Sequence, residues 1–123
     1  MNESWKDIPG YESLYQVSNL GRVRSLDRII MWEGGKRFAK GRILRQGLNS
    51  KGYMIVGLFS KNKRKNWQVH SLVALCFLGH EPNLKIVVDH IDHNPQNNKL
   101  ENLQIITQSE NVKRGKQRFK SKL

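Results

Sequence analysis

The sequence predicts an α+β protein in which a small N-terminal antiparallel sheet lobe precedes a strand–loop–strand–helix unit. Short segments that alternate apolar and polar residues, the pattern of half-buried strands, follow one another through the first half of the chain. The helical signals come later: an apolar run at 71–78 and a capping signal at 107–110. With 123 residues, these elements fit one compact unit, or two lobes too small to be fully independent.

The first lobe is expected to consist of short strands joined by exposed turns. Turn residues at 19–21 and 49–52 separate the alternating segments. The glycine-containing segment 32–36 is expected to be a flexible loop, and the lysine-rich segment 61–66 a basic turn. The strands themselves are expected at residues 14–18, 22–26, 42–46 and 53–59, with a return strand from 67.

The second half is expected to contain two helices and a pair of strands. Residues 71–78 form a short buried helix, with Gly79 as its C-terminal cap. A strand at 86–90 is followed by a long polar loop at 92–98 and an answering strand at 103–106. Thr107 and Glu110 form a capping box that begins a last helix, from 108 to about 116.

Charge is the strongest bulk signal. Twenty-two Lys and Arg residues against ten Asp and Glu give a net charge of +12. Self-repulsion of this size is offset by a polyanion, and nucleic acid is the usual one; a solvated basic face is the alternative. The lone Cys76 excludes an internal disulfide and a multi-thiolate zinc site, which favours a reducing cytoplasm. No apolar run is long enough to span a bilayer, and no signal peptide is recognisable.

The charge is unevenly placed along the chain. Residues 1–69 carry a net +9 and residues 111–123 a net +6, whereas residues 70–110 carry a net −3. Carboxylates facing phosphate gain nothing unless a cation lies between them. An acidic island inside a basic chain therefore indicates a metal site.

Three residues in or directly after this acidic segment have the chemistry of a metal-dependent hydrolase. Asp89 ends a strand, and Asn111 lies one turn into the last helix, so a helix packed across the strand pair would bring two oxygen ligands together. His90 points to the opposite side of the strand and suits a general base. On spacing alone, Asp89 and Asn111 could equally be turn and helix-surface residues, and His90 a satisfied strand-end histidine.

These residues also carry a family resemblance. Segments 88–92, 97–103 and 107–111 resemble the ββα-metal (His-Me finger) core of HNH endonucleases, in the phage and intron-encoded homing branch, where the third motif position is Asn. Residues 69–74 with Phe77 resemble the helix that precedes this core. Residues 5–11 and 15–25 resemble the nuclease-associated modular domain. The resemblance implies a modular DNA-binding lobe at 1–66, a nuclease core at 67–116 and a basic tail at 117–123.

The resemblance implies a role for each motif residue. Asp89 and Asn111 would hold one divalent ion, Mg²⁺ or Mn²⁺. His90 would activate the attacking water, and Asn102 would hold the His90 imidazole in its working orientation. The products would carry a 5′ phosphate and a 3′ hydroxyl, with one strand nicked per site.

The implied partner is double-stranded DNA, met in the cytoplasm of a bacterial host by a phage-encoded protein; phage packaging or replication proteins are further candidates. His93 stands where the family often has a small residue, and is expected to face solvent or phosphate. The residues expected to contact DNA are Arg22, Arg24, Lys51, Lys61, Lys63, Arg64, Lys65, His70, His93, Lys113 and Arg114. Two other functions remain open: a DNA-binding module without catalysis, and a packaging accessory protein of a phage particle.

Overall fold

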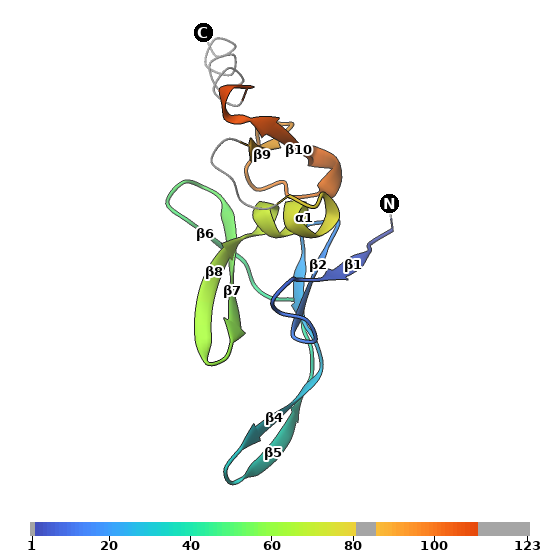
Figure 1. Ribbon diagram of the computed structural model, residues 1–123, viewed down its shortest axis with the longest axis vertical. Coiled ribbons are helices and arrows are strands. Elements are labelled where there is room, and N and C mark those ends of the chain that lie inside the picture. Colours follow the sequence, from blue (N-terminus) through green and yellow to red (C-terminus); the bar gives the residue numbers. More distant parts are fainter. Residues whose placement is uncertain (1, 81–85, 111–123) are drawn as a thin grey trace.

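The computed structural model describes residues 2–80 and 86–110, and it has the expected α+β architecture. Strands dominate this part of the chain, with one α-helix at its centre (Figure 1). The elements are β1 (Trp5–Asp7), β2 (Tyr15–Ser18), β3 (Val23–Ser25), β4 (Arg28–Trp32), β5 (Gly35–Ala39), β6 (Gly47–Leu48), β7 (Met54–Ser60), β8 (Lys63–Gln68), α1 (Val69–Phe77), β9 (Ile86–His90), the 3-10 turn η1 (Leu100–Asn102) and β10 (Leu103–Thr107).

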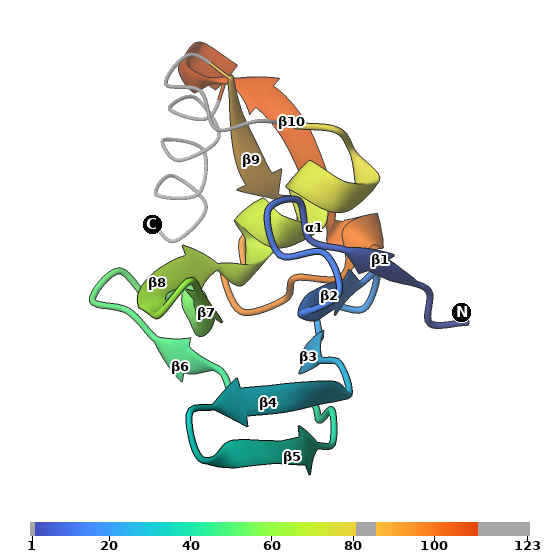
Figure 2. The same cartoon turned by 60° about the horizontal axis from the view of Figure 1, so that its bottom comes forward.

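The strands form four small antiparallel sheets around α1. Their orders are β1-β2-β3, β4-β5, β6-β7-β8 and β9-β10. Figures 1 and 2 show the β4–β5 hairpin projecting at one end of the molecule and the β9–β10 pair at the other, with α1 between them. In the β9–β10 pair, Leu103 lies opposite His90 and Gln104 opposite Asp89. This register places both candidate site residues where the β9 strand ends.

The largest difference from the sequence expectations is the β4–β5 hairpin. Residues 32–36, expected to be a loop, are only the tip of this hairpin, in which Trp32 pairs with Gly35. Several of its large apolar side chains are exposed: Ile29, Met31, Trp32 and Phe38. Because strand prediction relies on one face being buried, a hairpin with little burial gives no clear alternation.

Three smaller differences concern element boundaries. The basic turn is limited to Lys61 and Asn62, which adopt positive φ values of 52° and 64°, and β8 begins directly afterwards at Lys63. The expected strand at 42–46 is reduced to a single bridge between Arg24 and Ile43. The helix begins at Val69, two residues before its expected start, whereas Gly79 follows its end with a positive φ, as expected.

The hydrophobic core is shared between the two halves of the chain. Val69, Leu72 and Val73 of α1 are fully buried and belong to one cluster with Ile8 and Val17 of the first lobe. Trp67 and Tyr11 also bond across the halves, with the indole Nε1 donating to the tyrosine hydroxyl at 3.1 Å. The lobes therefore stabilise each other. No helix in the described part of the chain is both long and apolar enough to cross a membrane.

We expect Leu72→Ala to lower the free energy of unfolding by about 2–5 kcal/mol, because it leaves a cavity in this shared core. Urea unfolding followed by circular dichroism and tryptophan fluorescence should show one coincident transition, shifted to lower urea. The control is Met31→Ala, at a position that is 76% exposed, with a cost below about 0.5 kcal/mol. Two separate transitions would contradict a shared core.

Candidate active site

Asp89 and His90 occupy the end of β9, and both are buried, at 5% and 7% exposure. Neighbouring side chains on a strand point to opposite sides, but both residues line one polar cavity at the end of β9. The Asp89 carboxylate accepts a hydrogen bond from Nε2 of Gln104, its cross-strand neighbour, at 2.9 Å. The pairing of β9 with β10 therefore fixes the direction of this carboxylate.

The imidazole of His90 is held by Asn98. Its Nε2 atom lies 2.7 Å from the Asn98 side-chain oxygen Oδ1. Since an amide oxygen only accepts hydrogen bonds, Nε2 must carry the proton. In the neutral ring, the lone pair is then on Nδ1, the state that a general base requires.

Within the described residues, no hydrogen bond joins the Asn102 side chain to the imidazole, which corrects the role expected for it. Its Nδ2 donates to Asp92 Oδ1 at 2.9 Å and to the Asn97 carbonyl at 2.8 Å, while its Oδ1 accepts from the Asp92 backbone N–H at 3.0 Å. Both side-chain atoms of the amide, Nδ2 and Oδ1, therefore help to close the loop between β9 and β10. Asn102 therefore shapes the loop, and Asn98 is the residue that sequence reasoning missed.

Asp92 is the charged anchor of this loop. The Asn97 side chain, the Asn94 backbone N–H and the Asn102 side chain all donate to its carboxylate, and they lower its pKa to about 2. A carboxylate that accepts several hydrogen bonds is stabilised in its ionised form. Asp92 is therefore ionised at neutral pH, although its role is structural.

Two aromatic rings form a wall beside His90. The His70 ring lies 5.1 Å from the His90 ring and 5.0 Å from the Tyr53 ring, while Tyr53 and His90 stack at 6.1 Å. Burial, with a smaller contribution from the neighbouring His90, lowers the pKa of His70 to about 4. His70 is only 7% exposed, so its ring is not presented to phosphate. The expectation that it contacts DNA is corrected: it is a neutral wall of the site.

A polar cavity of about 150 Å³ opens beside the two site residues. Lys51 and His93, both expected to contact DNA, lie on its rim: Lys51 is exposed and His93 half-buried. The remaining lining comes from Tyr53, Val88, Asp89, His90 and Pro95. The cavity therefore joins a carboxylate, an imidazole and a cation in one place.

The residues fit a hard divalent cation. Asp89 presents a buried carboxylate to a polar cavity, and oxygen ligands are those that Mg²⁺ and Mn²⁺ prefer. Within residues 2–80 and 86–110, no group of three or more His, Cys, Asp or Glu side chains could hold a metal. The two metal ligands expected from the sequence are instead one carboxylate, that of Asp89, and one side-chain amide. Its second member, Asn111, lies outside the described residues.

The start of the last helix is as expected. Thr107 Oγ1 accepts the backbone N–H of Glu110 at 3.2 Å and also bonds the Glu110 carboxylate. Residues 108–110 are helical, as the capping signal indicated. Lys113 and Arg114, expected to contact DNA, lie outside the described residues.

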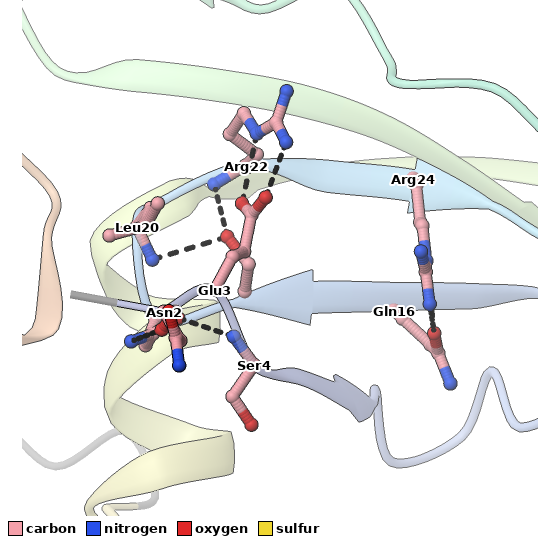
Figure 3. A network of polar contacts seen from close by, with 9 residues as sticks. Asn2, Glu3, Ser4, Gln16, Leu20, Arg22 and Arg24 are labelled. Atoms are coloured by element: carbon pink, nitrogen blue, oxygen red, sulfur yellow. Dashed lines mark hydrogen bonds and ion pairs between the residues drawn. The ribbon is translucent and has the colours of Figure 1, made fainter.

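Two arginines expected to contact DNA are engaged within the first lobe (Figure 3). Arg22 forms an ion pair with Glu3, which lowers the pKa of that carboxyl to about 2. Arg24 donates to the Gln16 side-chain oxygen at 2.6 and 3.0 Å and stacks over the Trp5 ring at 4.2 Å. The guanidinium groups of both arginines therefore already contact side chains of the first lobe.

A larger groove lies between the β4–β5 hairpin and β7. Its volume is about 740 Å³, and no acidic residue lines it among the residues described. Of its cations, only Arg64 was expected to contact DNA. The basic residues along it are Arg28, Arg37, Lys40, Arg42, Arg45 and Arg64.

Comparison with known proteins identifies the class. Residues 68–113 match the HNH endonuclease family, and residues 3–59 match the NUMOD4 motif. The chain therefore contains an HNH endonuclease segment that is preceded by a NUMOD4 motif, as the resemblance implied.

Individual relatives agree. DNA endonuclease I-HmuI of Bacillus phage SP01 is 44% identical over 109 residues, which are 88% of this chain and 55% of the relative. An uncharacterized HNH endonuclease of Acanthamoeba polyphaga mimivirus is 37% identical over 90% of this chain and 25% of its own length. A solved structure described as DNA binding and cleavage by the HNH homing endonuclease I-HmuI matches with a TM-score of 0.74 at 42% identity, over 94% of this chain and 59% of that one. The chain thus spans about half the length of I-HmuI.

We expect the buried His70 to make stability depend on pH. Its pKa of about 4 lies below the value of about 6.5 in an unfolded chain, so the unfolded state binds more protons between these values. The free energy of unfolding should therefore fall as pH falls through this window, by about 2 kcal/mol between pH 7 and pH 5. Urea titrations of native protein and His70→Gln should show a smaller fall in the variant; equal falls would contradict the assignment.

Proposed function

We propose that the chain is a divalent-metal-dependent DNA endonuclease that nicks one strand per site and leaves a 5′ phosphate and a 3′ hydroxyl. The observation that carries this proposal is the pairing, at one polar cavity, of a buried Asp89 carboxylate with an imidazole whose Nε2 is held by Asn98. The relative I-HmuI, a DNA endonuclease whose solved structure is described as one of DNA binding and cleavage, supports the same activity.

In this reaction, His90 acts as the general base. Its Nδ1 lone pair takes a proton from the water that attacks phosphorus, while Asn98 keeps Nε2–H in place. The Tyr53 ring and the neutral His70 ring pack against the imidazole and limit its rotation, and the neutral His70 keeps a competing positive charge away. We assign to Lys51, on the cavity rim, a contact with the phosphate next to the cleaved bond.

Asp89 and Asn111 are the residues that would hold the metal ion. When bound, the ion supplies positive charge that stabilises the crowded phosphate and the departing 3′ oxygen. When the 3′ oxygen departs, the phosphate stays on the 5′ oxygen of the following nucleotide. Gln104 contributes by fixing the direction of the Asp89 carboxylate.

We assign the docking of duplex DNA to the groove between the β4–β5 hairpin and β7. Its cations face one concave surface, and no acidic residue is among the described residues that line it, which suits a phosphate backbone. The exposed Trp32 and Phe38 of the hairpin add apolar contact area near the groove. Because one relative is a phage protein, we place this activity in the cytoplasm of a bacterial host.

We expect pure protein to nick supercoiled plasmid with Mg²⁺ or Mn²⁺ and to stop when a chelator is added. His90→Ala should lower the cleavage rate by about 100-fold or more, because general-base catalysis contributes about that much. Its affinity for DNA, measured by fluorescence anisotropy, should stay within about twofold. Native protein that binds DNA but never cuts it with any divalent ion would favour the alternative, a non-catalytic DNA-binding module.

We expect the double variant Arg42→Gln with Arg45→Gln to weaken DNA binding without lowering the cleavage rate at saturating DNA. Each lost phosphate contact should reduce the slope of log affinity against log salt by about 0.9. Arg22→Gln is the matched control, because Glu3 already compensates that charge. An unchanged salt slope in the double variant would show that DNA docks elsewhere.

A further inference from the structure

Asn98, whose side chain bonds the His90 imidazole, packs against the first lobe. Asn98 is 5% exposed, and its backbone lies against the turn at 19–21. A Cβ atom built on Gly21 would meet the Asn98 carbonyl oxygen at 2.9 Å and the Asn98 Cβ at 3.1 Å. Only a glycine therefore allows this approach, and Gly21 also has the positive φ, +83°, that favours glycine.

Hydrogen bonds fix the turn at 19–21, against which Asn98 packs. Asn19 is 7% exposed, and its Oδ1 accepts the Ser4 backbone N–H at 2.7 Å. The Gly21 backbone N–H donates to the Ser18 carbonyl at 3.1 Å, and the Gln46 side chain donates to the Gly21 carbonyl at 2.9 Å. Every one of these bonds lies within the first lobe.

The turn also bonds directly to the nuclease segment. The Leu100 backbone N–H donates to the Asn19 carbonyl at 2.7 Å. Two residues earlier, Asn98 meets Gly21, and its side chain reaches His90. A short path of contacts thus leads from the turn at 19–21, through Asn98, to the general base.

We propose that the first lobe positions the catalytic base: the turn at 19–21 seats Asn98, and Asn98 holds the His90 ring with Nε2 protonated and Nδ1 available to water. Asn98 is then a positioning residue, and Gly21 is needed for its seat. This inference rests on the proposed nuclease function and goes beyond it. In this inference, the lobe to which we assign DNA docking also positions the general base of the reaction.

The first test compares two glycine substitutions in the full chain. Gly21→Ala and Gly10→Ala impose similar backbone strain, because φ is +83° and +86°, but a Cβ on Gly10 meets nothing within 4 Å. Gly21→Ala should lower kcat for plasmid nicking about tenfold or more, with KM within about twofold. Gly10→Ala should leave kcat unchanged. Equal kcat values in the two variants, or a loss in KM alone, would overturn the proposal.

The second test acts on Asn98 directly and remains decisive if Gly21→Ala fails to fold. Asn98→Ala should lower kcat about tenfold or more without changing KM. Asn98→Asp should restore most of that loss, because its carboxylate keeps an oxygen that accepts from Nε2. If both variants lose the same activity, or neither loses any, then Asn98 does not position the base.

A readout without catalysis separates this inference from the proposed function. In ¹⁵N NMR spectra of the metal-free, DNA-free protein with a neutral imidazole, native His90 should show the Nε2–H tautomer. Asn98→Ala and Gly21→Ala should show a mixture of tautomers, and Gly10→Ala the native state. This pattern in a protein that never cuts DNA would overturn the nuclease function alone. A native spectrum in Asn98→Ala would overturn the positioning role alone.

Discussion

The site depends on how the loop between β9 and β10 is closed. That loop must leave Asp89 and His90 at the end of one strand and still return the chain to the neighbouring strand. Side-chain amides close it, because an amide donates and accepts hydrogen bonds at once: Asn102 bonds Asp92 and Asn97, and Asn98 bonds the imidazole. A loop without such bonds would leave Nε2 of the His90 ring without the hydrogen-bond acceptor that fixes its tautomer.

The two halves of the chain are structurally less independent than their separate sequence motifs suggest. The first lobe carries the basic groove, whereas the HNH segment carries the carboxylate and the imidazole. Yet both halves share one core around Leu72, and the turn at 19–21 supports the segment that contains Asn98. The uneven charge fits this arrangement, because the acidic island coincides with the site and the basic segments flank it.

Sequence reasoning succeeded where a local signal determined local structure. The strand that ends at His90 and the cap at Thr107 followed from periodicity and capping chemistry, and both are confirmed. It failed where tertiary contacts decided. Asn98 and Asn102 lie in one polar stretch without periodicity, so nothing local shows which of them reaches His90. The Tyr53 ring that lies against His70 comes from a segment that is distant in sequence.

The central claim is that Asp89 and Asn111 hold one divalent ion while His90 stays out of its ligand shell. Anomalous X-ray diffraction from crystals grown with Mn²⁺ and a short DNA duplex tests this most directly. The account requires a single Mn²⁺ peak bonded to oxygens of Asp89 and Asn111, with His90 Nδ1 facing a water beside the phosphate. A peak bonded to the His90 ring, or no peak at Asp89, would contradict it.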